Sequence, residues 1–321
     1  NYVGGIAGGL GNEVGSSIRN TGEVLVTTNR SYVIGKNYAG GITGINTAGV
    51  TLENCVNNGV AAATEKYAGG IVGYNEYRAK IKDCVSYLSD YDSSIYNMIV
   101  DKWKATGDYV GGIAGYNNGA ITFNSESQKV MVKSVSGIVA GGSYVGGIAG
   151  FNDVQGTLDA KYDLIGGRIH GDGDGVGGCF GLNASRSVLT SELVIKPRSV
   201  EGRYYVGGVI GANVVELNGQ EVTADGLRAQ NSLGVIRGQA FVGGVIGYQR
   251  TYAASQIGVD SGKPILEALE AAQKDSDRRL LPGLDDSHVP TAVQTSADTT
   301  GRLVLTAKGN SETEFTVDSN N

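Results

Sequence analysis

A nine-residue phrase recurs along the chain and constrains its fold more than any other feature. The clearest copy is YVGGIAGYN at residues 109–117. Close copies begin at Tyr38, Tyr67 and Tyr144, more divergent copies at Gly175, Tyr205 and Phe241, and a truncated copy, YVGGIAGGL, at Tyr2. Successive copies start 36, 29, 42, 35, 31, 30 and 36 residues apart. Intervals of this size indicate a repeat architecture in which each unit stacks on its neighbours.

The composition excludes several classes of protein. Glycine accounts for 52 of 321 residues, but only 4 are proline and glycine does not occupy every third position, which excludes collagen. Because hydrophobic residues make up 40%, the glycine content does not indicate disorder. A net charge of −6 without a dense Lys/Arg run argues against a nucleic-acid partner. No apolar run approaches the roughly 20 residues of a membrane helix, so we expect no membrane insertion by this segment.

Each unit reads as three short strands separated by turns. In the second unit the phrase at 38–46 is followed by VTLENCV (50–56) and VAAATEK (60–66), with TAG and NNG between them. Three strands in about 30 residues fit one coil of a parallel β-helix better than a propeller blade, which needs four strands in about 40–45 residues. We therefore predict an all-β fold, a parallel β-helix (β-solenoid) of about eight coils, over residues 1–250. At about 4.8 Å per coil its length would be about 40 Å.

The phrase itself is interpreted as one strand closed by a corner. Alternation would place Tyr109 and Ile113 on one face and Val110 and Ala114 on the other. The repeated glycines indicate close approach of another backbone or side chain. The closing Asn is expected to form a ladder, since side-chain amides can bond the coils above and below. The predicted ladder consists of Asn46, Asn75, Asn117, Asn152, Asn183 and Asn213.

The residue before each closing Asn is usually large and apolar. These residues are Ile45, Tyr74, Tyr116, Phe151, Leu182, Ala212 and, before Gln249, Tyr248. Two interpretations stay open: the corner directs them into the core, or they form an external stripe that meets a partner or a neighbouring chain. In the second case Tyr74, Tyr116 and Phe151 are candidate contact residues and should be substantially exposed.

An aromatic insertion lengthens the third unit. Residues 86–108 contain Tyr87, Tyr91, Tyr96 and the single tryptophan, Trp103. Exposed aromatic loops on a β-scaffold commonly bind sugars or proteins, so these four residues are candidates for contact with a glycan or protein. The alternative is that the loop packs its aromatic rings over its own coil.

The residues that could carry chemistry are few. Cys55 and Cys84 each follow their unit's Tyr by 17 residues, so they should stack as buried thiols or as a disulfide, and Cys179 is expected in the core. The stretch HGDGDGVGG (170–178) resembles one calcium-binding nonapeptide, although such sites need tandem copies, and a polar turn is the alternative. No G-x-S-x-G, phosphate-loop or zinc-site spacing occurs. We assign no catalytic, cofactor-binding or metal residues and expect no cofactor.

The phrase ends at Gln249, and residues 251–321 read differently. Residues 263–281 are predicted to form a helix, because Pro264 suits its first turn and apolar residues follow at helical spacing. This helix would cap the last coil or link to another domain. An extended connector and a C-terminal β-hairpin, RLVLTA (302–307) with ETEFTV (312–317), complete the predicted tail.

The repeated GG[IV]xGxN phrase, followed by a strand such as TLENCV or KIKDCV, resembles the GLUG-type repeat of large bacterial surface proteins and adhesins. The resemblance covers about residues 1–250 and implies an exported, extracellular stalk or adhesive rod on a bacterial cell surface, without catalytic residues. Since the sequence begins inside a unit, we expect a piece of a longer protein. Its partners would be a host glycan, a host protein or neighbouring chains.

Two other functions remain open. A polysaccharide lyase or glycoside hydrolase is the main alternative, because β-helices host such enzymes. That function would need clustered Asp/Glu and Lys/Arg on neighbouring coils. An ice-binding rod would need regular rows of Thr, and the Thr residues here are scattered.

Overall fold

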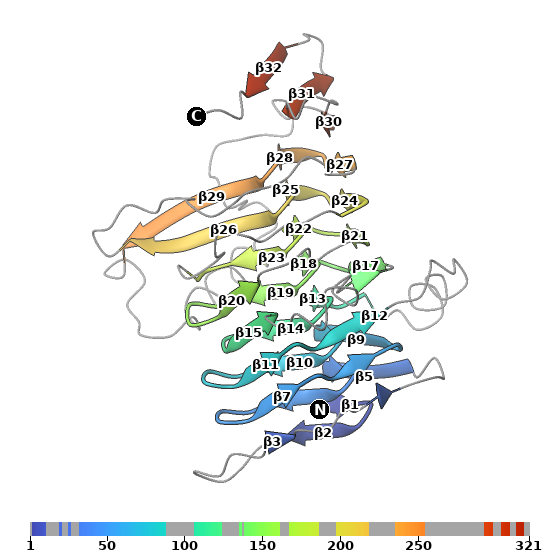
Figure 1. Ribbon diagram of the computed structural model, residues 1–321. Helices are drawn as coiled ribbons and strands as arrows, with labels where there is room; N and C mark the ends of the chain where they lie inside the picture. The colour runs from blue at the N-terminus through green and yellow to red at the C-terminus, as the bar shows by residue number, and fades with distance from the viewer. Residues whose placement is uncertain are drawn as a thin grey trace.

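The chain forms a parallel β-solenoid, as predicted. The computed structural model describes residues 2–10, 19–20, 25–26, 32–87, 106–123, 135–136, 138–160, 167–185, 197–217, 235–253, 292–297, 303–308 and 313–317. Every regular element in these ranges is a β-strand, and the strands stack in chain order from the N-terminus at one end to the C-terminus at the other (Figure 1).

Two eight-stranded parallel sheets run the length of the solenoid, so it has eight coils. Sheet A consists of β1 (Val3–Gly4), β5 (Tyr32–Gly40), β9 (Val60–Gly69), β13 (Asp108–Gly111), β18 (Val145–Gly146), β22 (Val176–Gly177), β25 (Tyr204–Gly207) and β28 (Ala240–Gly243). Sheet B consists of β2 (Ala7–Leu10), β6 (Thr43–Asn46), β10 (Val72–Asn75), β14 (Ala114–Asn117), β19 (Ala149–Asn152), β23 (Phe180–Asn183), β26 (Ile210–Leu217) and β29 (Ile246–Ala253).

Three shorter sheets close the coils. Sheet C consists of β3 (Arg19–Asn20), β7 (Thr51–Glu53), β11 (Lys80–Lys82), β15 (Ala120–Phe123) and β20 (Thr157–Ala160), and sheet D of β4 (Leu25–Val26), β8 (Val56–Asn57), β12 (Val85–Tyr87) and β16 (Val135–Ser136). Sheet E contains β17 (Ile138–Gly141), β21 (Arg168–Gly171), β24 (Ser199–Glu201) and β27 (Val235–Arg237) in the later coils.

The phrase is not one strand, and this corrects the sequence interpretation. Residues 108–111 form β13 in sheet A and residues 114–117 form β14 in sheet B, with a bend at 112–113 between them. Glycine permits the bend, because a Cβ at Gly111 would collide with the Ala114 carbonyl oxygen. The face assignment made from simple alternation is therefore wrong.

The predicted count of three strands per coil is also wrong for the second unit. Its VTLENCV segment divides into β7 and β8, and Asn54 between them has a φ of +55°. With the phrase itself split, that coil contributes a strand to each of sheets A, B, C and D.

The buried side chains form two separate clusters. The coil core is mainly aliphatic, and its most regular row is Ile42, Ile71, Ile113, Ile148, Cys179 and Val209. The aromatic cluster contains Tyr67, Tyr109, Tyr116, Tyr144, Phe151, Leu182, Ala184, Tyr205, Ala212, Val214 and Tyr248. The burial of Cys179 in the coil core agrees with its predicted place.

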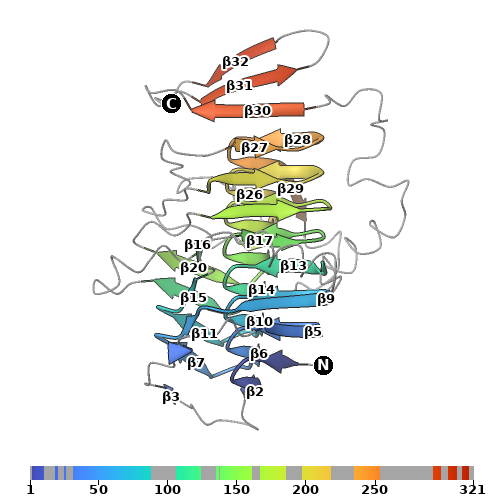
Figure 2. The same ribbon diagram turned by 90° about the vertical axis from the view of Figure 1, so that its right-hand side faces the viewer.

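The C-terminal strands lie beyond the last coil. β31 (Leu303–Lys308) and β32 (Thr313–Val317) pair antiparallel, as the predicted hairpin requires, and β30 (Ala292–Ala297) joins them to β27 (Figure 2). The helix predicted at 263–281 lies outside the described residues. Within the described part of the chain, no helix is long and apolar enough to cross a membrane.

Candidate functional site

The closing Asn residues form the continuous ladder that the sequence predicts. Each Nδ2 donates to the Oδ1 of the next coil's Asn. The five distances are 2.9 Å for Asn46 to Asn75, 2.8 Å for Asn75 to Asn117, 2.8 Å for Asn117 to Asn152, 2.9 Å for Asn152 to Asn183 and 2.7 Å for Asn183 to Asn213. All six residues are buried. The phrase therefore uses its Asn to join coils.

The ladder stops at the first coil, where Leu10 pairs with Asn46 in sheet B. Leu10 offers no side-chain donor, and the buried Oδ1 of Asn46 has no hydrogen-bond partner among the described residues. An unsatisfied buried acceptor costs about 1–3 kcal/mol. The first coil thus differs from the second to seventh coils at the position that links coils most regularly.

The first residue of the phrase adopts left-handed backbone geometry. Its φ is +56° at Tyr38, +64° at Tyr67, +59° at Tyr109, +58° at Tyr144, +56° at Tyr205 and +53° at Phe241. Such a conformation costs a non-glycine residue about 1–2 kcal/mol. In the sixth coil this position is Gly175, with a φ of +73°.

Ring stacking offsets this backbone cost. The ring centroids of Tyr38 and Tyr67 are 5.1 Å apart, those of Tyr67 and Tyr109 5.1 Å, and those of Tyr109 and Tyr144 5.0 Å. We call this row the tyrosine column; it consists of Tyr2, Tyr38, Tyr67, Tyr109 and Tyr144. Stacked pairs of this kind contribute about 0.5–1.5 kcal/mol beyond the area they bury.

The residues before the closing Asn pack against the tyrosine column. Tyr116 is 4% exposed and Phe151 0%, while Tyr74 is half-buried. Tyr74 and Tyr116 stack at 4.3 Å, and Tyr116 meets Tyr67 edge-on at 5.8 Å. The external stripe, which required substantial exposure, is therefore not formed, and the core interpretation describes these residues.

The bend in the phrase explains this placement. A Cβ on Gly115 would lie 2.6 Å from the carbonyl carbon of Tyr67, because β14 packs closely on the phrase of the preceding coil. The neighbouring side chain of Tyr116 is thereby held against the tyrosine column.

A buried carboxyl group adjoins the aromatic cluster. Asp153 is 1% exposed, accepts a hydrogen bond from the Tyr116 hydroxyl, and accepts another from the Val154 amide at 2.7 Å. Burial raises the pKa of Asp153 above its usual range. Burial also raises the pKa of Tyr116, the Asp153 charge adds to that effect, and burial raises the pKa of Tyr74 to about 12. The two tyrosines therefore remain protonated donors.

Sequence reasoning did not identify Asp153. The available signal was its place directly after a closing Asn, where other coils carry Thr47, Glu76 and Asn118. Nothing in that pattern indicates burial, since an acid in a turn is ordinarily solvated.

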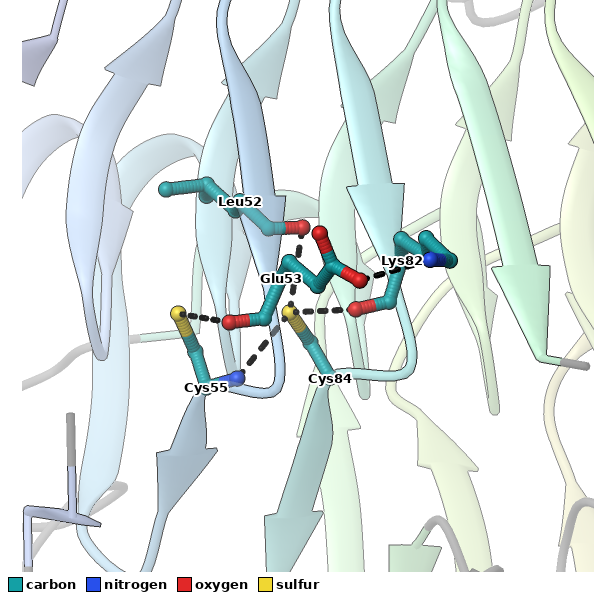
Figure 3. A network of polar contacts seen from close by, with 5 residues as sticks. All are labelled: Leu52, Glu53, Cys55, Lys82 and Cys84. Atoms are coloured by element: carbon teal, nitrogen blue, oxygen red, sulfur yellow. Dashed lines mark hydrogen bonds and ion pairs between the residues drawn. The ribbon is translucent and has the colours of Figure 1, made fainter. Parts of the chain in front are cut away.

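Cys55 and Cys84 stack on neighbouring coils as buried free thiols (Figure 3). The Cys84 sulfur accepts a hydrogen bond from the Cys55 amide at 3.4 Å and lies 3.4 Å from the Lys82 carbonyl oxygen. Burial raises the pKa of the Cys84 thiol. The side-chain hydrogen bond with Cys84 lowers the pKa of the Cys55 thiol. Two residues before each cysteine, at the ends of β7 and β11, Lys82 Nζ lies 2.6 Å from Glu53 Oε1.

Charged residues gather on the later coils around sheet E. His170 Nε2 lies 3.2 Å from Asp172 Oδ1, and His170 Nδ1 lies 4.0 Å from Glu201 Oε2. Arg203 Nε lies 3.0 Å from Asp174 Oδ1. We call these five residues the sheet E polar face.

The stretch 170–178, which resembles a single calcium-binding nonapeptide, contributes His170, Asp172 and Asp174 to this face. The described residues include no group of three or more His, Cys, Asp or Glu side chains that could hold a metal ion. Asp174 is instead bound by Arg203 from the next coil.

The aromatic insertion is only partly described. Tyr87 ends β12, whereas Tyr91, Tyr96 and Trp103 lie outside the described residues. Sequence reasoning missed another exposed aromatic residue, Tyr77, which is 48% exposed on the turn between β10 and β11. The Arg78 guanidinium lies 5.0 Å from the centre of its ring. The signal was an aromatic residue between two charged ones, in a turn.

Comparisons of the chain with protein-family models, with curated proteins and with solved structures give no match.

Proposed function

We propose that the chain is a non-enzymatic structural and adhesive β-solenoid, exposed outside the cell on a bacterial surface protein. The observation that carries the proposal is the internal use of the repeated phrase. Its glycines form the bend, its Tyr stacks on Tyr, and its Asn bonds to Asn in neighbouring coils. A phrase that links coils in this way builds a stiff rod, and the resemblance to GLUG-type repeats supplies the surface location.

Contact with a partner would then depend on turns and insertions. Tyr77 with Arg78 offers an exposed ring and a cation on one turn, a combination suited to stacking on a sugar ring and bonding its hydroxyls. The aromatic insertion, with Trp103, Tyr91 and Tyr96, is the other proposed contact segment. Neither Tyr77 nor Arg78 belongs to the Asn ladder.

Binding to arrays of glycans and extracellular host proteins tests the adhesive role. The wild-type chain is compared with Tyr77→Ala and Trp103→Ala, and Tyr32→Ala serves as a control, because Tyr32 is also exposed, at 37%. We expect the wild type to bind a ligand. Its affinity should fall at least tenfold in either Tyr77→Ala or Trp103→Ala and should not change in Tyr32→Ala. Absence of binding by the wild type, or equal loss in all three variants, would refute the proposal that these segments mediate adhesion.

A polysaccharide lyase or glycoside hydrolase is the second candidate, and the sheet E polar face favours it. Acids and an arginine lie there on neighbouring coils, as such an enzyme would need. Glu201 beside His170 could move a proton, and Arg203 could neutralise a substrate carboxylate. Incubation with polygalacturonate, alginate and host glycans would test this function. Product formation abolished by Glu201→Gln, but retained in the sheet C variant Lys82→Gln, would establish it over the structural role.

A further inference from the structure

Two of the three cysteines of the chain lie opposite each other on neighbouring coils. β8 pairs with β12 so that Val56 faces Val85, and β7 pairs with β11 in the same register. Cys55 and Cys84 lie between these pairs, at the corner from sheet C to sheet D. Neighbouring strands are about 4.7–4.9 Å apart, and the Cα atoms of disulfide-bonded cysteines are usually about 4.4–6.8 Å apart. The spacing of the two coils therefore suits a disulfide.

The two thiols point the same way and are in contact. Each cysteine follows a residue at positive φ, Asn54 at +55° and Asp83 at +50°. Cys55 Sγ lies 3.7 Å from the carbonyl oxygen two residues earlier, and Cys84 Sγ lies 3.4 Å from the equivalent oxygen. The Cys55 amide donates to Cys84 Sγ at 3.4 Å, and a side-chain hydrogen bond joins the two thiols. A bond between the sulfurs therefore requires no rearrangement of the register.

Cys179, the third cysteine, has no thiol on the coils next to it. The Ile148 amide donates to the Cys179 carbonyl at 2.8 Å, and the Cys179 amide donates to the Val209 carbonyl at 2.7 Å. Its neighbours along the coil core are thus aliphatic. Cys179 is therefore an internal control for the chemistry of the other two.

We propose that Cys55 and Cys84 form a disulfide in the exported protein, and that the free thiols described above are its reduced form. The inference rests on the proposed extracellular location, because disulfides persist in oxidising compartments. The bond joins the second and third coils covalently. Cys84 directly precedes β12, where the aromatic insertion (86–108) begins, so the bond also anchors the start of that proposed contact segment.

A small disulfide such as oxidised glutathione is a sufficient oxidant. The Cys55 thiolate attacks one glutathione sulfur, which forms a mixed disulfide and releases one glutathione thiol. The Cys84 thiolate then attacks the Cys55 sulfur and releases the second glutathione thiol. The pair loses two protons and two electrons in total, and the glutathione disulfide is reduced to two thiols. Since both cysteines are buried in the folded chain, the exchange precedes closure of the coils over them.

Thiol counting after refolding tests this proposal. The full chain is reduced, unfolded in urea and refolded with equal amounts of reduced and oxidised glutathione. The refolded protein is then denatured with an alkylating agent, which labels each remaining thiol. We expect one labelled cysteine, Cys179, and a bond between the tryptic peptides 37–66 and 83–102. The same count on a chain fused to an export signal and purified from a bacterial periplasm needs no refolding.

Two matched variants identify the pair. Cys179→Ala should lose both of its remaining thiols, whereas Cys84→Ala should keep both of its own. Oxidation should raise the urea midpoint of the wild type and of Cys179→Ala, and leave that of Cys84→Ala unchanged. Three labelled thiols in the refolded and the exported wild type, or bonds distributed among all three cysteines, would overturn the proposal. So would a wild-type midpoint that oxidation leaves unchanged or lowers.

The outcome is independent of the adhesion test, because thiol counting needs no ligand. A disulfide-bonded chain that binds no glycan or host protein would refute the adhesive role alone. A chain that binds its ligand with all three thiols free would refute the disulfide alone.

Discussion

The coil core and the aromatic cluster run side by side through the same coils, but they restrict the sequence differently. In the coil core the row that begins at Ile42 accepts Ile, Val and Cys, because any apolar side chain of suitable volume fills it. In the aromatic cluster the first residue of the phrase must also accept a positive φ. At this first position the chain carries either an aromatic residue whose ring stacks or a glycine. The coil core therefore selects for volume, and the aromatic cluster for volume and backbone conformation together.

The sixth coil shows this difference within one molecule. Gly175 replaces the aromatic residue, and its ideal Cβ would meet the Tyr144 ring. The residue before the closing Asn becomes Leu182 in the same coil. The aromatic stacking stops there and resumes with Tyr205 and Phe241, while the coil core continues without interruption.

The largest expected effect comes from removing one ring of the tyrosine column. Tyr109→Ala should destabilise the protein by about 3–5 kcal/mol, because it leaves a cavity between Tyr67 and Tyr144 and keeps a strained φ. Tyr109→Gly removes the strain as well as the ring. It should be at least as stable as Tyr109→Ala in urea denaturation. At positions with negative φ an Ala variant is ordinarily more stable than a Gly variant. If Tyr109→Ala were clearly more stable than Tyr109→Gly, the positive φ of residue 109 would not destabilise a non-glycine residue.

The next effect concerns the Asn ladder. Asn117→Leu keeps the side-chain size but leaves the Asn75 donor and the Asn152 acceptor without their ladder partner. We expect a loss of about 2–4 kcal/mol in the free energy of unfolding. Asn46→Leu, at the end of the ladder, should cost less because only its bond to Asn75 belongs to the ladder. Equal losses in the two variants would show that the ladder does not act through paired amides.

The third effect depends on pH and tests the buried acid beside the aromatic cluster. The pKa of Asp153 is raised by burial, so its contribution to stability is fully present below the unfolded pKa of about 3.9 and is lost as pH rises through the folded value. Asp153→Asn should therefore gain stability relative to the wild type as pH rises through that window. Thermal unfolding of both proteins from acid to neutral pH measures the difference. A difference that is constant with pH would refute the effect.

The smallest expected effect is at the first coil. Leu10→Asn would supply a donor for the buried Oδ1 of Asn46, at the expense of the apolar contact of Leu10 with the coil core. Compared with Leu10→Ala, which loses the contact without supplying a donor, we expect Leu10→Asn to be more stable by about 1 kcal/mol. Equal unfolding midpoints would mean that the ladder cannot extend into this coil.

The sequence predicts the regular features of this protein well. The recurrence of the phrase predicts the parallel solenoid with its eight coils, and the fixed place of Asn in each unit predicts the ladder from Asn46 to Asn213. The reason is that in-register stacking brings equivalent residues together whatever the cross-section of the coil. The C-terminal pairing of β31 with β32 follows from local alternation and a turn, which are also properties of sequence.

The tertiary structure alone decided the direction in which each side chain points. The bend at 112–113 depends on amides that bond the next coil, and no local pattern distinguishes it from a straight strand. That bend turns Tyr116 and Phe151 inward rather than outward. Contacts with other coils likewise hold Tyr109 at positive φ and bury Asp153. The sequence by itself determined which residues stack, because spacing fixes the register. Cross-coil bonding decided which way they face, since it fixes the backbone.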